Sequence, residues 1–117
     1  MGKSRFPKPD QVFSQNLATG ALSFTTTTPS GVAFHLDQII FHSTVAISET
    51  ITITVDSVKG ANYDTILQEV VLVTETDYVY RPQGDAIFNA GDEIKITCSD
   101  DGGVGTVYGI VKTSEIS

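Results

Sequence analysis

The fold class is decided by Phe88-Asn89-Ala90-Gly91-Asp92-Glu93-Ile94-Lys95-Ile96-Thr97-Cys98. A Gly-Asp turn leads into residues that alternate strictly between apolar and polar side chains. Successive residues of a strand point to opposite faces of a sheet, so Ile94, Ile96 and Cys98 share one face. The stretch therefore predicts a strand with one buried face and one face in water.

Most other segments of the chain alternate in the same way. In residues 46–58, Ile51, Ile53 and Val55 alternate with threonines, and all of these β-branched residues suit a pleated surface. Turn residues separate further short segments of this kind at 21–25, 32–43, 65–74, 78–81 and 106–112. A helix is the alternative for 63–73, but its many β-branched residues favour a strand. We predict an all-β antiparallel β-sandwich, jelly-roll or Greek-key like.

The predicted strand at 32–43 is apolar on both faces. Strict alternation places Leu36 and Ile40 on one face. Ile39 and Phe41 then fall on the other face. A strand that is apolar on both sides is either central in a sheet or buried by a partner.

The length of 117 residues predicts a single domain with its own core. Residues 1–11 contain Pro7 and Pro9 and show no periodicity, so we expect an extended N-terminal arm without a strand. The single β-sandwich domain is then residues 12–117. The start of the chain lacks the hydrophobic segment of a signal peptide, and no apolar run reaches the ~20 residues of a membrane span.

The charge is unevenly distributed along the chain. The total is −7, from 7 basic and 14 acidic residues. Residues 1–10 hold three basic residues and one acidic residue, a balance of +2. Residues 11–117 hold the remaining four basic and thirteen acidic residues, a balance of −9. An acidic body repels phosphates, so we expect no nucleic-acid partner.

The basic arm is the predicted contact surface for other proteins. It either contacts the acidic body of a neighbour or a phosphate, or it remains a solvated terminus. The residues chosen for this contact are Lys3, Arg5, Phe6 and Lys8. Deletion of residues 1–10 is expected to leave the sandwich folded and to weaken assembly.

The sequence predicts no catalytic residue, no cofactor and no metal site. His35 and His42 are separated by an odd number of residues, so they project to opposite faces of one regular strand. His35 and Asp37 share a face, but one such pair is a weak signal for a metal. Asp100-Asp101-Gly102 fits a solvated turn better than a Ca²⁺ loop. The single cysteine, Cys98, lies on the apolar face of its strand and is predicted to be a buried hydrophobic residue.

Tyr78 and Tyr80 share a face of their predicted strand. Exposed pairs of aromatic rings can stack on sugars, and the acidic loop at Asp100-Asp101 could take part. The chain has no tryptophan, which weakens this interpretation. Packing in the core or at a subunit interface is the alternative role for both tyrosines.

A series of turn and strand motifs runs through residues 46–112. After the Ile/Thr strand, they are Gly60-Ala61-Asn62-Tyr63-Asp64, Thr76-Asp77-Tyr78-Val79-Tyr80-Arg81-Pro82, Asn89-Ala90-Gly91-Asp92-Glu93-Ile94 and Gly105-Thr106-Val107-Tyr108-Gly109-Ile110. This order resembles small β-rich structural proteins of tailed bacteriophages, several of which decorate the capsid or sit at the head–tail or tail junction. The resemblance implies a virion component that is not an enzyme, and it carries over no functional residue.

Three functions follow as hypotheses. The first is a virion structural protein, assembled in the host cytoplasm, that forms homo-oligomers and docks on other virion proteins without contacting a membrane. The second is a carbohydrate-binding or adhesin-like module that uses Tyr78 and Tyr80. The third, an enzyme, lacks a catalytic constellation in the sequence.

Overall fold

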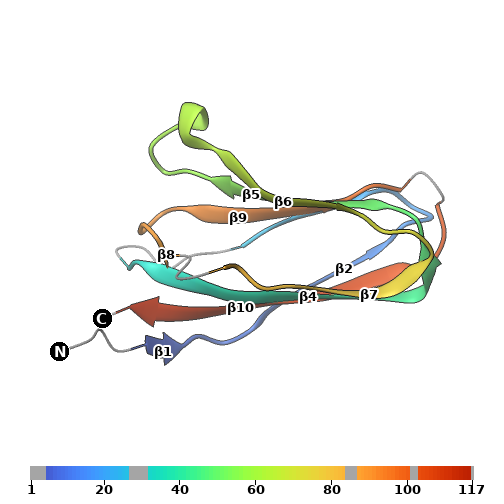
Figure 1. Ribbon diagram of the computed structural model, residues 1–117, viewed down its shortest axis with the longest axis horizontal. Helices are drawn as coiled ribbons and strands as arrows, with labels where there is room; N and C mark the ends of the chain where they lie inside the picture. The colour runs from blue at the N-terminus through green and yellow to red at the C-terminus, as the bar shows by residue number, and fades with distance from the viewer. Residues whose placement is uncertain (1–4, 27–31, 84–86, 101–102, 117) are drawn as a thin grey trace.

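Two antiparallel sheets lie one above the other in the computed structural model, which describes residues 5–26, 32–83, 87–100 and 103–116 (Figure 1). The first sheet contains β1 (Arg5–Pro7), β2 (Gln11–Asn16), β4 (Phe34–Ile47), β7 (Glu75–Tyr80), β8 (Ile87–Phe88) and β10 (Thr106–Ile116). The second sheet contains β3 (Leu22–Thr25), β5 (Thr50–Asp56), β6 (Thr65–Val71) and β9 (Glu93–Cys98). The predicted all-β sandwich is confirmed.

Two strands form the centre of the first sheet. β10 pairs with β1 and β2 on one side and with β4 on the other. β4 pairs in turn with β7 and β8. The second sheet has the order β3-β9-β5-β6, and its inner face packs on the first sheet.

The alternation of β9 and β5 has the expected result. Ile94, Ile96 and Cys98 of β9 are buried. Ile51 and Ile53 of β5 are buried beside them, because Ile51 is opposite Cys98 and Ile53 is opposite Ile96. The intervening polar residues face outward, so both strands bury one face only.

The turn before β9 is held by a buried carboxylate. Asp92 Oδ1 accepts the amide hydrogen of Val58 at 2.9 Å, and Oδ2 accepts that of Asn89 at 2.9 Å. Gly91 has φ +90°, and a Cβ there would lie 2.9 Å from Val58 Cγ2. The turn therefore needs glycine both for its conformation and for its close packing on the loop after β5.

Three phenylalanine rings join the two sheets. The Phe13 ring stacks on Phe24 at 5.1 Å between centroids and meets Phe41 edge-on at 5.4 Å. Phe13 is opposite Gly109 in the register of β2 and β10. The ring occupies the space that a side chain at Gly109 would fill.

A β-bulge at Asp37 shifts the alternation of the β4 side chains by one residue. Lys112 of β10 is opposite Gln38, but Thr113 is opposite Leu36, which leaves Asp37 as the extra residue. Leu36 and Ile39 are therefore both buried despite their odd spacing. The prediction that Leu36 and Ile40 share a face is wrong for this reason.

The N-terminal segment is part of the first sheet. β1 pairs with the end of β10, and the amide of Lys8 donates to the carbonyl of Thr113 at 3.0 Å. The expected strand-free arm over residues 1–11 is thus corrected within its described part, since residues 1–4 lie outside it. Pro7 and Pro9 lack an amide hydrogen, which suits the edge of a sheet.

The alternative helix at 63–73 is not found, because β6 occupies most of that segment. A single 3-10 turn, η1 (Ala61–Tyr63), precedes β6. Within the described ranges, no helix has the length and apolar character needed to cross a membrane.

Candidate functional site

The predicted contact residues of the N-terminus have different positions. Lys3 lies outside the described residues, and only the backbone of Arg5 and Phe6 is described, in β1. Lys8 Nζ forms an ion pair with Glu115 of β10 at 3.1 Å. Lys8 therefore has a partner within its own chain.

Tyr78 and Tyr80 do share a face, and it is the inner face of β7. Tyr78 is opposite Phe41, and their ring centroids are 6.0 Å apart. Both tyrosines are half-buried, and burial raises the pKa of Tyr80, with a smaller contribution from Tyr78. Together with Gln68 and Arg81, they line a cleft of about 500 Å³ between β6 and β7, which are the last strands in the order of each sheet.

The two histidines lie on the same face of β4, contrary to the prediction. His35 is opposite Ser114 and His42 is opposite Tyr108 of the regular strand β10. Ser114 and Tyr108 are an even number of residues apart, so the bulge in β4 brings both histidines to the outer face. Seven residues of strand still separate them by roughly 20 Å, too far for one metal ion.

The acidic loop shows no ligand geometry in its described part. The Asp100 carbonyl accepts the amide hydrogen of Gly103 at 2.8 Å, which closes a turn. Asp101 and Gly102 lie outside the described residues. The described part of the chain contains no group of three His, Cys, Asp or Glu side chains that could hold a metal ion.

Cys98 is 1% exposed. Burial raises the pKa of its thiol to about 11, and the charges of Glu49 and Asp100 add to the shift. A thiol in this state is a poor nucleophile. The predicted role as a buried hydrophobic residue fits its position.

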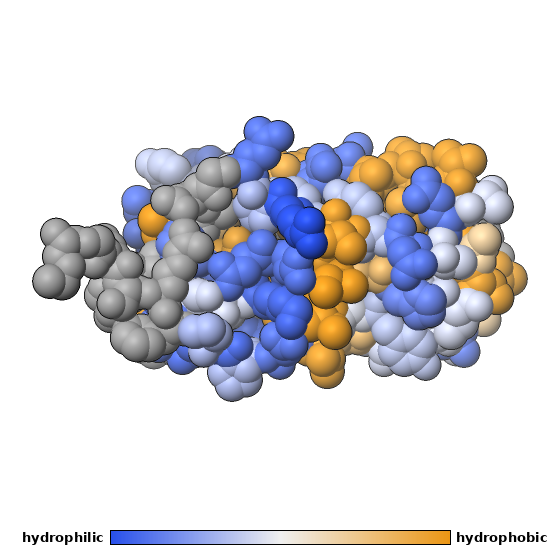
Figure 2. Space-filling view, turned by 60° about the horizontal axis from the view of Figure 1, so that its bottom comes forward, coloured by the Kyte–Doolittle hydropathy of each residue, from blue (hydrophilic) through white to orange (hydrophobic). Residues whose placement is uncertain are grey.

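An apolar stripe crosses the outer face of the first sheet, and Figure 2 shows it as a hydrophobic band between polar side chains. Val12 of β2 is opposite Ile110 of β10, Ile110 is opposite Ile40 of β4, and Ile40 is opposite Val79 of β7. Val12 is 69% and Val79 is 46% exposed, whereas Ile40 and Ile110 are half-buried. The four residues (the apolar stripe) form one row at right angles to the strands.

Two polar rows border the apolar stripe. The row on one side, which we call the Asp77 row, consists of Ser14, Tyr108, His42 and Asp77. The row on the other side, the Arg81 row, consists of Asp10, Lys112, Gln38 and Arg81. Each member of a polar row lies two residues along the chain from a member of the apolar stripe.

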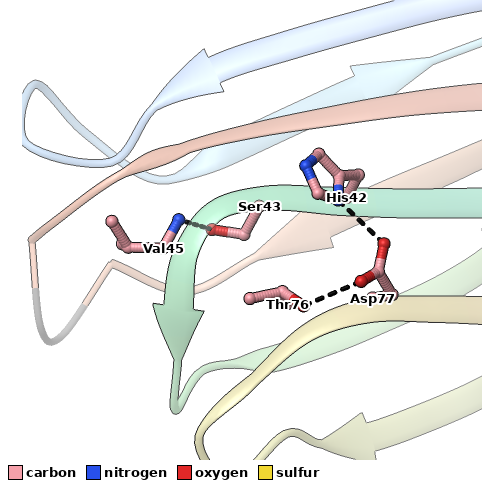
Figure 3. A network of polar contacts seen from close by, with 5 residues as sticks. All are labelled: His42, Ser43, Val45, Thr76 and Asp77. Carbon is pink, nitrogen blue, oxygen red and sulfur yellow. Dashed lines mark hydrogen bonds and ion pairs between the residues drawn. The ribbon is translucent and has the colours of Figure 1, made fainter.

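The charged groups of both rows already have partners within the chain. His42 Nδ1 and Asp77 Oδ1 are 2.8 Å apart, and the Thr76 hydroxyl donates to Asp77 Oδ2 at 2.7 Å (Figure 3). The hydrogen bond with His42, and then that with Thr76, lowers the pKa of Asp77.

In the Arg81 row, Lys112 Nζ lies 3.0 Å from Asp10 Oδ2. Arg81 Nε donates to Gln38 Oε1 at 3.1 Å. These side chains are exposed and in water, so their pairings are weak and exchangeable.

A shallow apolar groove of about 400 Å³ lies over the stripe. Val12, Ile40 and Ile110 line it, with Tyr108 and His42 at its border. Phe13, Ser14 and Gly109 complete its lining, and the imidazole of His42 at its border is hydrogen-bonded to Asp77 of the neighbouring strand. The groove is suited to apolar contact.

The sequence interpretation did not identify the apolar stripe. Its four members come from four strands that are far apart in the chain, so only the register aligns them. One signal was present, because Ile40 lies in the segment that is apolar on both faces. β4 is central, and it also exposes part of its second face.

Comparison with known proteins gives no assignment: no protein-family model matches the chain, and no curated protein was found that is similar to it in sequence.

Proposed function

We propose that this chain is a non-enzymatic structural subunit that acts by self-association and by docking on other proteins, as a capsid-decoration or head–tail accessory subunit of a tailed bacteriophage does. The observation that carries the proposal is the apolar stripe, an ordered row of four aliphatic side chains on a face turned to water. Contiguous apolar surface of this kind is typical of protein–protein interfaces. A location in the virion, after assembly in the host cytoplasm, is part of the proposal.

Two further observations support this class of protein. The first is the resemblance of residues 46–112 to small phage structural proteins. The second is the strand order, β2-β10-β4-β7 over β3-β9-β5-β6, from which we infer a jelly-roll connectivity. Jelly rolls occur in viral capsid proteins and also in lectins, so connectivity supports the proposal without excluding a sugar-binding role.

Native mass spectrometry of the full chain tests the proposal, at protein concentrations from about 1 µM to about 1 mM, which covers weak to moderate affinities. Measurements at low and moderate salt separate apolar association from charge effects. We expect a discrete closed oligomer that persists at moderate salt, because apolar contacts are not screened. A monomer under every condition would contradict self-association as the mode of action.

The cleft at Tyr78 and Tyr80 favours carbohydrate binding as a second candidate. It combines two half-buried aromatic rings with the polar groups of Gln68, Gln83 and Arg81. Both tyrosines pack on the core, so alanine variants would also destabilise the fold. Gln83→Ala and Tyr80→Phe are better tests on a glycan array. Binding that these variants abolish would favour this candidate, and the absence of glycan binding would eliminate it.

A further inference from the structure

We propose that the apolar stripe is the interface through which two copies of this chain pack face to face, about a two-fold axis that runs along the stripe. The inference rests on the proposed function, because it names a second copy as the partner and this surface as the contact. The dimer joins the outer faces of two first sheets into an additional apolar layer.

The first argument is the form of the surface. Neighbouring members of the apolar stripe are partners in the register, so their side chains form a continuous apolar row on a regular sheet. Two such faces can pack with their strands nearly aligned, about 10 Å apart, as the two sheets of a sandwich do. The apolar stripe of one copy then lies on the apolar stripe of the other.

The second argument is charge complementarity. An axis along the stripe places each stripe residue against its own counterpart and the Asp77 row of one copy over the Arg81 row of the other. Asp77 then faces Arg81 of the second copy, because each lies two residues from Val79 on β7. Lys112 faces the ring of Tyr108 of the second copy, because each lies two residues from Ile110. These are an ion pair and a cation–π contact, and the symmetry forms each twice.

An axis parallel to the strands gives a poorer match. It would place Arg81 over Asp10 of the second copy but would leave Asp77 over Ser14. Lys112 would lie over Gln38, without an aromatic ring or an acid. The axis along the stripe is therefore the better solution for this arrangement of charges.

The third argument is size. The sheets lie along the longest and shortest axes of the molecule, whose extents are 48 Å and 22 Å (Figure 1). A standard interface takes about 800 Å² from each partner. A sheet face of about 48 Å by 22 Å is only slightly larger than this area, so a standard interface would cover most of it. The exposed Val12 and Val79 would then lie inside the contact.

Sedimentation velocity of the full chain over about 1 µM to about 1 mM tests the surface, in about 0.15 M salt so that the −7 charge of each copy is screened. Val79→Glu puts two like charges against each other on the axis, and we expect the dimer Kd to rise about 100-fold or more. The matched control is Val71→Glu on β6, which changes the charge equally. Val71 is 66% exposed and lies on the second sheet, so the Kd should stay within about twofold.

A charge-exchange series tests the axis. Asp77→Arg and Arg81→Asp each place like charges together, and each should weaken the dimer by about tenfold. The double variant restores opposite charges across the interface and should return the Kd to within about threefold of the original. All three variants keep the apolar stripe, so a general effect on folding would not produce the rescue.

Cross-linking with a short bis-maleimide distinguishes the two axes. Cys98 is buried, so an introduced cysteine is the accessible thiol. Val79→Cys should cross-link to itself if the axis runs along the stripe. If the axis runs parallel to the strands, a mixture of Val12→Cys and Val79→Cys should react instead, because β2 then faces β7.

The outcomes separate the inference from the proposed function. An oligomer that Val79→Glu leaves intact would overturn the inference and preserve the assembly role. An oligomer that is disrupted only by Val71→Glu would move the contact to the second sheet and would also overturn it. A monomer at all concentrations would contradict both. Loss of the dimer in Val79→Glu, rescue in the double variant and self-cross-linking of Val79→Cys together establish the interface.

Discussion

Gly109→Ala is a direct test of how the core is packed. A Cβ at this position would lie 1.9 Å from Cζ of Phe13 and 2.3 Å and 2.4 Å from its two Cε atoms. Carbon atoms in contact are about 3.5–4.0 Å apart, so the ring would have to move by roughly 1.5–2 Å. Phe24 and Phe41 flank that ring at centroid distances of 5.1 Å and 5.4 Å, so it has no free space to enter.

The magnitude follows from two opposing effects. Overpacking of a dense core costs about 1–3 kcal/mol. Replacement of glycine by alanine also restricts the unfolded chain, which returns about 0.4–1 kcal/mol where the backbone allows it. The displaced ring loses contact with two aromatic neighbours, so we place the overpacking cost at its upper end. The expected net loss in the free energy of unfolding is about 2 kcal/mol.

Urea unfolding of four proteins measures this value: the original chain, Gly109→Ala, Phe13→Leu and the double variant. Leucine lacks the three ring atoms that the new Cβ would meet, so Gly109→Ala should cost almost nothing in that background. The coupling between the two sites should then be about 2 kcal/mol. Ser14→Ala, an exposed neighbour, is the surface control and should change stability by less than about 0.5 kcal/mol. Additive losses in the double variant would refute the packing described for Phe13 and Gly109.

Three further predictions concern pH and the chain terminus. Cys98 should react with iodoacetamide far more slowly in the folded protein than in urea, and fast labelling of the folded protein would contradict its burial. The pKa of the Cys98 thiol is about 11 in the folded protein and exceeds the ordinary 9.0, so the contribution of the thiol to stability is complete below about pH 9 and is lost as the pH rises towards 11. The stability of Cys98→Val should not show this loss at alkaline pH. The pKa of Asp77 is lowered below 3.8, chiefly by the hydrogen bond with His42, so its contribution is present above that pH and is lost as the pH falls through the lowered value. Carbon-detected NMR should show the lowered pKa of Asp77 and a smaller lowering in His42→Ala. Unfolding measurements at several pH values should show a smaller loss of stability in acid for Asp77→Asn. An Asp77 that titrates at or above 3.8 would contradict the prediction. Removal of residues 1–7 should lower the free energy of unfolding by about 1–3 kcal/mol, because β10 loses the backbone partners of β1, and an unchanged urea midpoint would show that β1 contributes nothing.

The faces of the regular strands could be predicted from the sequence alone. Ile94 and Ile96 alternate with charged or hydroxyl side chains, and two-residue periodicity is a local property of a strand. The buried side of β5 followed in the same way. Burial of one face then makes a two-sheet sandwich the natural arrangement for strands of this length.

The irregular features could not be predicted, because they depend on partners far away in the chain. The bulge at Asp37 arises where β4 pairs with β10, and the Ser114 hydroxyl donates to the Asp37 carboxylate there. Nothing in residues 32–43 marks this shift. The sequence therefore places Ile40 and His35 on opposite faces, although both lie on the outer face. The pairing of β1 was missed because two prolines conceal the periodicity of a short edge strand.

The apolar stripe shows the same limit for the candidate site. Val12 and Val79 are single valines in strands that otherwise look amphipathic, and isolated exposed valines are ordinary. They become a surface feature only when the register places them in one row with Ile40 and Ile110. A single sequence read by itself contains no information that aligns residues of four separate strands.

The central position of β10 has a consequence for biosynthesis. A ribosome delivers residues 106–116 after every other described strand, although they separate β2 from β4 in the finished sheet. Until then the nascent chain has a gap at the centre of one sheet, with two long rows of unpaired backbone groups that can capture other strands. The sandwich can therefore close only after residues 106–116 have been made. A message truncated upstream of codon 106 would yield an aggregating product and not a smaller soluble fragment.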